Sequence, residues 1–204
     1  APEHLSAYCF IPEPGTPLGD AVLRGAAPLP APEVQADAYA EIEALAGTAG
    51  LACYETSNFA LEGAEARHNV VYWLRRPYLG LGPSAHGFWD GTRYGNAYAR
   101  TRWADALEAG REPAAEIEPE TRDGAAREVV MLGLRLAGGL EADDYDPALW
   151  RDVVARYGPA FDRAVAAGRL ERTGERPGGG VRIPAGLRFV ADDAQYGQPD
   201  LGGD

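Results

Sequence analysis

Residues 55–88 hold two of the chain's three histidines among many aromatic and polar side chains, a composition typical of a pocket lining. The run HNVVYW begins at His68, whose neutral imidazole could act as an axial ligand of haem iron. The rings of Tyr72 and Trp73 could stack on a flat macrocycle, and Asn69 could hold the loop or bond a propionate. On residue types alone, lone histidines are more often structural than ligating, so both interpretations of His68 stay open.

A second polar group, Glu55, Ser57 and Asn58, follows directly after a predicted strand. Ligands of parallel sheets bind beyond the carboxyl ends of the strands. Glu55 is therefore a candidate for holding a cationic or hydroxyl group of a ligand. The alternative is a cap or turn satisfied by Ser57 and Asn58.

A glycine turn, Gly80-Leu81-Gly82, precedes Ser84 and His86 and could bring the backbone close to a ligand. It does not match the GxGxxG pattern, so a dinucleotide site is weakly supported. Three arginines flank the HNVVYW run: Arg67, Arg75 and Arg76. They could clamp carboxylates such as propionates, or they could simply keep a surface solvated.

The elements that must position these residues are predicted from hydrophobic periodicity. A buried strand over 4–10, a helix over 31–49 and a strand over 51–55 predict a βαβ unit with a parallel sheet, and hence an α/β fold. On the helix we expect Val34, Ala38, Ile42, Leu45 and Ala49 to face inward. Residues 55–88 are expected to be mostly loop.

Further elements follow from local signals. We expect short helices over 18–24 and 102–109, and a hairpin over 88–94 around Asp90-Gly91. A helix over 121–136 begins at the cap Thr121, Pro147 and Pro159 each open a further helix, and short strands cover 170–173 and 181–183. Two helices and a two-stranded wing are typical of a winged-helix-like module. The acidic, glycine-rich residues from 191 to 204 are expected to be disordered.

Composition narrows the function classes. The 204 residues carry a formal charge of −12, and all 19 basic residues are arginine. An acidic chain lacks the basic face that nucleic acids or anionic membranes require. Cys9 and Cys53 form no CxxC pair, and no apolar run of membrane-spanning length or secretory signal is present. We therefore expect a cytoplasmic protein with reduced thiols, no nucleic-acid partner and no transmembrane segment.

Seven short motifs in order resemble those of one known family. They are LSAY at 5–8, EPGT at 13–16, YETSNFA at 54–60, RHNVVYW at 67–73, YLGLG at 78–82, SAH at 84–86 and MLGLR at 131–135. Together they resemble the C-terminal half of the radical SAM haem chaperones of the HemW family. These are closely related to the oxygen-independent coproporphyrinogen III oxidases. The resemblance covers about residues 4–189.

The resemblance implies a fold and a set of ligands. Residues 1–118 would form the last part of an incomplete radical SAM (β/α) barrel, 119–190 a helical winged-helix-like domain, and 191–204 a tail. The implied cofactors are haem, S-adenosylmethionine and a 4Fe-4S cluster. Haem binding carries over to His68, Asn69, Tyr72 and Trp73, while Ile11 and His86 would line the S-adenosylmethionine side of the pocket.

The chain also departs from the family. The cluster motif CxxxCxxC is absent, since only Cys9 and Cys53 are present, and the family often has a cysteine where Ala66 stands. Three thiolates are needed to hold the cluster that cleaves S-adenosylmethionine. The sole methionine is Met131, and the chain opens on a strand. We therefore expect a fragment of a longer protein that performs no radical chemistry by itself.

The sequence leaves three hypotheses for the function. The leading hypothesis is a haem chaperone fragment that binds haem or porphyrin and delivers haem to a respiratory haem protein. The second is a coproporphyrinogen III oxidase, which removes carbon dioxide from propionates in porphyrin biosynthesis. The third is a non-catalytic winged-helix interaction module. The HNVVYW run favours the chaperone over the oxidase.

Overall fold

The computed structural model describes residues 2–9, 11–173 and 180–184, and the chain divides into two compact units. Unit 1 comprises the described residues up to Glu65, and unit 2 those from Ala66 to Pro184. The predicted domain boundary after residue 118 falls inside unit 2. The tail predicted at 191–204 lies outside the described residues.

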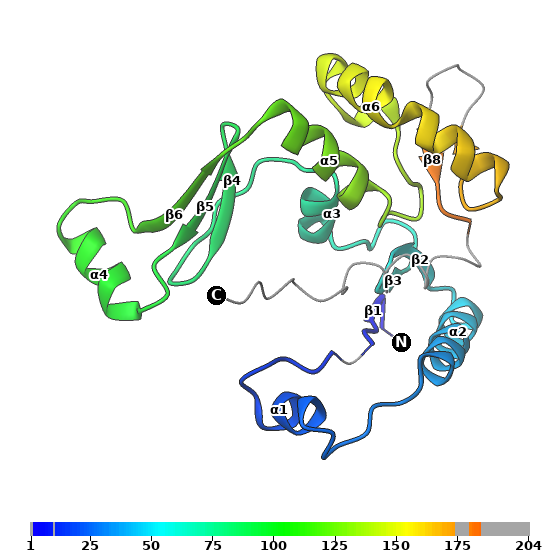
Figure 1. Cartoon of the computed structure of the whole chain (residues 1–204), viewed down its shortest axis with the longest axis horizontal. Helices are drawn as coiled ribbons and strands as arrows, with labels where there is room; N and C mark the ends of the chain where they lie inside the picture. The colour runs from blue at the N-terminus through cyan, green and yellow to red at the C-terminus, as the bar shows by residue number, and fades with distance from the viewer. Residues whose placement is uncertain (1, 10, 174–179, 185–204) are drawn as a thin grey trace. The chain divides into compact units, whose positions relative to one another are not determined.

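Unit 1 contains a three-stranded antiparallel sheet (Figure 1). β1 (His4–Ser6) and β2 (Ala52–Glu55) both pair with β3 (Asn58–Ala60), which lies between them. β1 and β2 thus run in the same direction, but the predicted parallel sheet is wrong, because both strands pair antiparallel with β3. Only Thr56 and Ser57 join β2 to β3, and a two-residue connection permits only an antiparallel return.

The two helices predicted in unit 1 are confirmed as α1 (Pro17–Leu23) and α2 (Pro32–Thr48). The predicted inward face of α2 is only partly correct, since Val34 and Leu45 are about 60% exposed. The face that packs is rotated, because the helix lies against the ring of Phe59 from β3. The buried core of unit 1 is Tyr39, Ala46, Leu51 and Phe59.

Unit 2 contains a second antiparallel sheet in the order β4-β5-β6, visible as three adjacent strands in Figure 1. β4 (His86–Trp89) and β5 (Thr92–Asn96) form the predicted hairpin. Both turn residues, Asp90 and Gly91, have positive φ angles of 47° and 67°, as a type I′ turn requires. α4 (Arg100–Glu108), also predicted, connects β5 to β6 (Ala114–Pro119), which was not predicted.

The rest of unit 2 is mainly helical. α5 (Arg122–Gly133) begins at the predicted cap, since Thr121 Oγ1 accepts a hydrogen bond from the Gly124 N–H. A 3-10 turn, η1 (Ala142–Asp144), then leads into α6 (Pro147–Ala166). The predicted break at Pro159 is wrong, because α6 continues through it.

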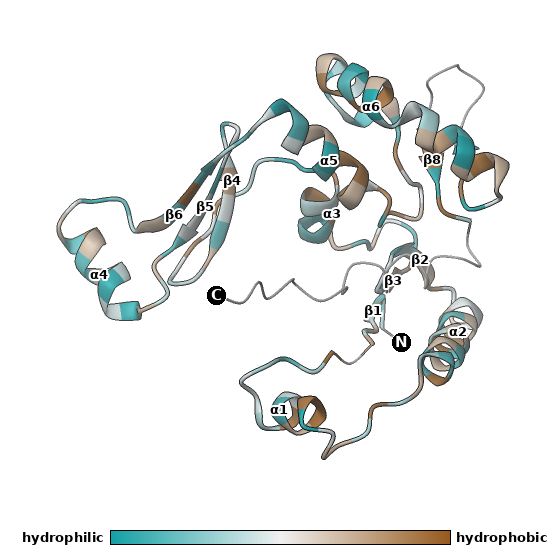
Figure 2. Ribbon diagram, in the orientation of Figure 1, coloured by the Kyte–Doolittle hydropathy of each residue, from teal (hydrophilic) through white to brown (hydrophobic). Residues whose placement is uncertain are grey.

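The continuity of α6 has a packing explanation. A proline inside a helix removes one hydrogen bond and tends to kink it. Trp150 and Val153 before the proline and Phe161 after it are all buried in one core cluster. In Figure 2, apolar and polar residues are interspersed along α6, as expected of a helix with one face in a core. Burial on both sides of Pro159 therefore outweighs the lost hydrogen bond.

A small hairpin completes unit 2. β7 (Glu171–Thr173) pairs antiparallel with β8 (Gly180–Arg182), which confirms the two predicted strands. Val181 of β8 is fully buried with α5 and α6. The cluster is Ala126, Val129, Leu140, Tyr145, Trp150, Val153, Phe161 and Val181. Within the described ranges, no helix is both long and apolar enough to cross a membrane.

The first residues of α6 provide a test of this core. Asp146 caps the helix by accepting hydrogen bonds from the N–H groups of Ala148, at 2.8 Å, and Leu149, at 3.2 Å. We expect Asp146→Ala to lower the free energy of unfolding by about 1 kcal/mol, because two helix-terminal donors lose their acceptor. Urea titration measures the loss. Asp143→Ala, an exposed carboxylate one turn earlier, is the matched control and should change little; equal effects would contradict the capping role.

Candidate functional site

The HNVVYW run forms a short helix, α3 (Arg67–Trp73), and not the predicted loop. Val70, Val71 and the aromatic residues have low helix propensity, which explains the wrong prediction. Tertiary contact between α3 and α5 supplies the missing stability. None of the seven residues is fully buried, and His68 is exposed.

One face of α3 carries a chain of aromatic contacts. His68 and Tyr72 are one helical turn apart, and Nε2 of the imidazole lies 2.6 Å from the Tyr72 hydroxyl. Their rings meet edge-on with centroids 4.8 Å apart, and Tyr72 meets Tyr78 edge-on at 4.5 Å. The structure thus brings together two of the predicted haem-binding residues and adds Tyr78, which follows them in sequence.

Trp73 ends the same helix. The guanidinium of Arg135 lies over its indole ring at 4.9 Å from the centroid, a cation–π contact. The indole Nε1 is buried and has no hydrogen-bond partner among the described residues. Asn69 is half-buried on the first turn. The four residues of the predicted haem group therefore share one two-turn helix.

The helix ends in an arginine with a left-handed backbone. The Arg75 N–H bonds the carbonyl of Tyr72 at 3.0 Å, and the Arg76 N–H bonds that of Val71 at 2.8 Å, which together form a Schellman motif. Arg75 has φ 55° at the position where glycine is usual. A left-handed conformation costs a residue with a side chain roughly 1–2 kcal/mol. The side chain of Arg75 must therefore have contacts that offset this strain.

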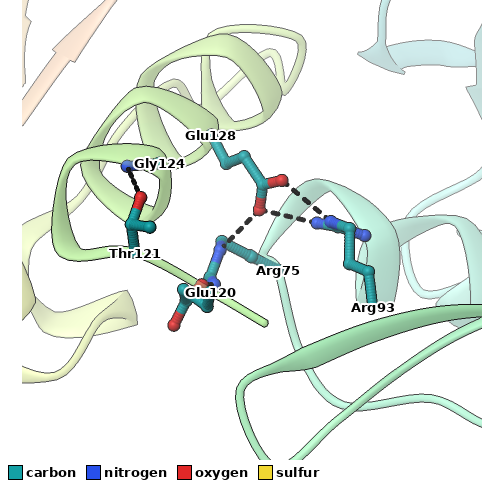
Figure 3. Close-up of polar contacts among 6 residues, drawn as sticks. All are labelled: Arg75, Arg93, Glu120, Thr121, Gly124 and Glu128. Carbon is teal, nitrogen blue, oxygen red and sulfur yellow. Dashed lines mark hydrogen bonds and ion pairs between the residues drawn. The ribbon is translucent and has the colours of Figure 1, made fainter. Parts of the chain in front are cut away.

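The ionic contacts of the Arg75 side chain are shown in Figure 3. Arg75, whose side chain is 7% exposed, forms an ion pair with Glu120, and its Nε lies 2.9 Å from Glu128 Oε2. Arg93 of β5 binds the same Glu128 carboxylate through two hydrogen bonds, at 2.8 and 2.6 Å. Both guanidinium groups also lie against the Phe88 ring, at 4.6 and 4.9 Å from its centroid. We call Arg75, Arg93, Glu120, Glu128 and Phe88 the Glu128 cluster.

The charges of the Glu128 cluster are mutually stabilised. Burial acts to raise the pKa of Glu128, but the hydrogen bonds and positive charges of Arg93 and Arg75 outweigh it, so this pKa lies below its ordinary value. The hydrogen bond to Glu128 in turn raises the pKa of Arg93. Glu128 is thus ionised at neutral pH and joins α5 to β5 and to the end of α3.

The glycine turn of residues 80–82 is held by the hairpin. Asn96 Nδ2 donates hydrogen bonds to the carbonyls of Gly80, at 3.1 Å, and Gly82, at 2.8 Å, and the Gly80 N–H donates to the Tyr94 hydroxyl at 3.0 Å. A Cβ on Gly80 would lie 2.4 Å from the His86 carbonyl oxygen, and Gly82 has φ 104°. Gly80 therefore requires glycine because the His86 backbone approaches it closely, and Gly82 because of its own positive φ.

This turn borders an open cavity of about 490 Å³ in unit 2. Its apolar lining includes Leu79, Leu81, Trp89, Trp103, Leu107 and Ile117. Tyr94, which lines the cavity, and Arg93, which binds Glu128, are neighbours on β5, so their side chains lie on opposite faces of the sheet. The predicted Gly80 and Gly82 are therefore on the other side of the sheet from the Glu128 cluster.

The remaining predicted residues of unit 2 are exposed. His86 begins β4, and its imidazole lies over Gly95, where an added Cβ would be 3.0 Å from the ring. Ser84 has φ 61°, and its N–H bonds the Ala97 carbonyl at 3.1 Å.

Glu55, Ser57 and Asn58 lie in unit 1 and are buried. The Asn58 side chain donates hydrogen bonds to the Glu55 carboxylate and, at 3.2 Å, to the Tyr8 hydroxyl, and it accepts one from Ser6. The Glu55 carboxylate is therefore bound by the Asn58 side chain of the same unit. Ile11 lies in an exposed loop of the same unit.

Sequence reasoning missed the Glu128 cluster. Arg75 was considered as a clamp for a ligand carboxylate, but in the structure it binds the carboxylates of Glu120 and Glu128. No local pattern pairs these residues, because they are separated by 45 and 53 positions. Within the described ranges, no three His, Cys, Asp or Glu side chains gather as a metal site.

Comparison with known proteins identifies relatives of this chain. No family model matches it. It is 38% identical over 138 residues to the heme chaperone HemW of Mycobacterium tuberculosis, and 36% identical over 141 residues to that of a Synechocystis strain. Over 85 residues it is 47% identical to a mitochondrial radical S-adenosyl methionine domain-containing protein 1 of Bos taurus. These matches confirm the resemblance predicted from the motifs.

The matches cover 68% of this chain but only 35% and 34% of the two HemW proteins, so the chain spans about a third of their length. Among solved structures, the fold is similar to that of coproporphyrinogen III oxidase (HemN) from Escherichia coli, described as a radical SAM enzyme. That likeness has a TM-score of 0.67 at 17% identity and covers 95% of this chain and 47% of the other. It shows a shared fold of mixed α and β structure.

The Glu128 cluster generates a test of stability. We expect Glu128→Gln to lower the free energy of unfolding at pH 7 by about 1.5–3 kcal/mol, because hydrogen bonds to charged groups are lost. Since folding lowers the pKa of Glu128, its contribution is present above the ordinary value of 4.5 and is lost as the pH falls through the lowered pKa. Urea titrations of the wild type and Glu128→Gln should therefore converge in acid.

A matched control uses another ion pair of α5. Arg122 binds Asp152 at 2.7 Å, and the arginine is 79% exposed. Asp152→Asn should cost only about 0.2–1 kcal/mol, as exposed pairs do. A Glu128→Gln effect as small as that of Asp152→Asn, or one independent of pH, would contradict the role assigned to Glu128.

Proposed function

Because this chain is similar to HemW heme chaperones over 68% of its length, we propose that it is part of a haem chaperone and that α3 is its haem-binding helix. Haem is then the cargo of the protein. As the resemblance implies, the cargo passes to a respiratory haem protein.

The observation that carries this proposal is the arrangement on α3. An exposed imidazole, His68, stands one turn before the aromatic ring of Tyr72, and Trp73 follows directly. Imidazole binds iron, and aromatic rings pack on a macrocycle.

The contact between His68 and Tyr72 suggests how binding is kept reversible. With the Tyr72 hydroxyl 2.6 Å from Nε2, this nitrogen is engaged in a hydrogen bond before iron arrives. Iron must displace the hydroxyl to reach Nε2, which weakens binding by the free energy of that bond. A carrier that must release its cargo benefits from such a competitor.

The 4Fe-4S cluster does not fit this chain. Its two cysteines, Cys9 and Cys53, cannot supply the three thiolates that the cluster requires. The residues of this chain therefore support no radical cleavage of S-adenosylmethionine. In the whole protein, we propose that Ile11 lies on the S-adenosylmethionine side of the pocket, as the resemblance implies.

Coproporphyrinogen oxidation is the alternative, and the fold likeness to HemN does not favour it over a chaperone. The two functions differ in their product. Incubating the intact protein with coproporphyrinogen III should leave the substrate unchanged if the protein is a carrier. Loss of carbon dioxide from the propionates, detected by mass spectrometry, would contradict a pure chaperone.

We expect His68→Ala to weaken haem binding at least about tenfold, since removing even an outer partner of a metal ligand has effects of 10–100-fold. Haem titration of the intact protein, followed by the Soret band, measures both affinity and ligation. His86→Ala is the comparison, because His86 is the other exposed imidazole of unit 2. An unchanged spectrum in His68→Ala, or a change only in His86→Ala, would contradict the assignment of His68.

If the Tyr72 hydroxyl competes with iron for His68, its removal should have the opposite effect to His68→Ala. Tyr72→Phe keeps the ring but removes the hydroxyl, so we expect haem to bind about fivefold more tightly, as a hydrogen bond of about 1 kcal/mol allows. Tyr98→Phe, at a residue 90% exposed, is the control and should leave the affinity unchanged. Weaker binding in Tyr72→Phe would show that the hydroxyl contacts haem and does not compete with it.

A further inference from the structure

α3 cannot hold its position by its own helical hydrogen bonds. It has seven residues, its N-cap residue Ala66 makes no side-chain cap, and it buries no residue fully. Isolated helices of this length are unstable in water. A haem-binding face on α3 therefore depends on the contacts that attach the helix to the rest of unit 2.

The strongest polar attachment is at the end of the helix. Arg75 stands two residues after Trp73, in a left-handed conformation that favours glycine. Glycine would close the Schellman motif without strain, so ending the helix does not explain an arginine. What the arginine adds is a side chain, 7% exposed, that reaches Glu120, Glu128 and the Phe88 ring.

The partners of Arg75 are themselves fixed. Arg93 holds the Glu128 carboxylate from β5 through two hydrogen bonds, and Glu128 belongs to α5. The two oxygens of Glu128 thus serve two arginines from two elements (Figure 3). Planar, multiply hydrogen-bonded guanidinium–carboxylate contacts define direction as well as distance.

We propose that Arg75 is a positioning residue for haem binding, which fixes the orientation of α3 through Glu128 without touching haem itself. This inference rests on the proposed function of α3. It assigns a role to a side chain of the protein interior that the motif HNVVYW does not include.

The test exploits the left-handed backbone. Arg75→Gly removes the side chain and relieves the backbone strain, so the end of the helix stays intact. We expect haem affinity to fall about tenfold, equivalent to about 1.4 kcal/mol, and amide hydrogen exchange across residues 67–74 to become faster. Glu128→Gln should produce the same two changes, and the double variant should add little to either single one, because all three break one linkage.

Two further variants complete the experiment. Asp152→Asn breaks the exposed ion pair between Arg122 and Asp152. It should leave both the haem affinity and the amide hydrogen exchange of α3 at wild-type values. Arg75→Lys keeps the positive charge but not the planar set of N–H donors. Its haem affinity should therefore lie between that of Arg75→Gly and that of the wild type.

The outcomes separate the two proposals. Wild-type exchange rates in α3 of Arg75→Gly would overturn the positioning role, whether or not the protein binds haem. Faster exchange with unchanged haem affinity would also overturn it. If His68→Ala binds haem as the wild type does while exchange in Arg75→Gly is faster, the haem site on α3 fails, yet the attachment of the helix by Arg75 stands.

Discussion

The arrangement of the elements in unit 2 depends on the carboxylate of Glu128. It accepts hydrogen bonds from Arg75 and Arg93, so one side chain joins the long helix α5, the hairpin β4-β5 and the end of α3. Desolvation alone would disfavour its charge, and the two guanidinium groups reverse that effect. Both arginines also cover the Phe88 ring, so apolar and ionic contacts stabilise the same arrangement.

This arrangement explains how a marginal helix can carry a functional face. α3 presents His68 toward solvent, where a ligand can reach it, and buries none of its residues fully. Contacts with α5 stabilise it, and so does Arg75 just after the helix, which occupies a conformation that an arginine adopts only when other contacts offset the strain. The structure thus separates the residues that can meet a ligand from those that hold them in place.

Much of the local structure was predictable. Thr121 before a periodic apolar run predicts the start of α5, and Asp90-Gly91 predicts the β4-β5 turn, because capping and positive φ depend on residues close in sequence. The failures share a different origin. The helix at HNVVYW, the continuity of α6 through Pro159 and the insertion of β3 between β1 and β2 each depend on contacts with distant segments, which outweigh local preference.

The sequence by itself determined the family resemblance and the candidate haem group, because ordered motifs and residue types are properties of the chain alone. It could not determine how those residues are held. Gly80 and Gly82 suggested a ligand, yet the structure explains both glycines without one, through the close approach of the His86 carbonyl to Gly80 and the positive φ of Gly82. Arg75 suggested a clamp for propionates, and only folding brings Glu128 to it across 53 positions. Ion pairs of this kind leave no local pattern, since their geometry exists only once three separate elements have packed together.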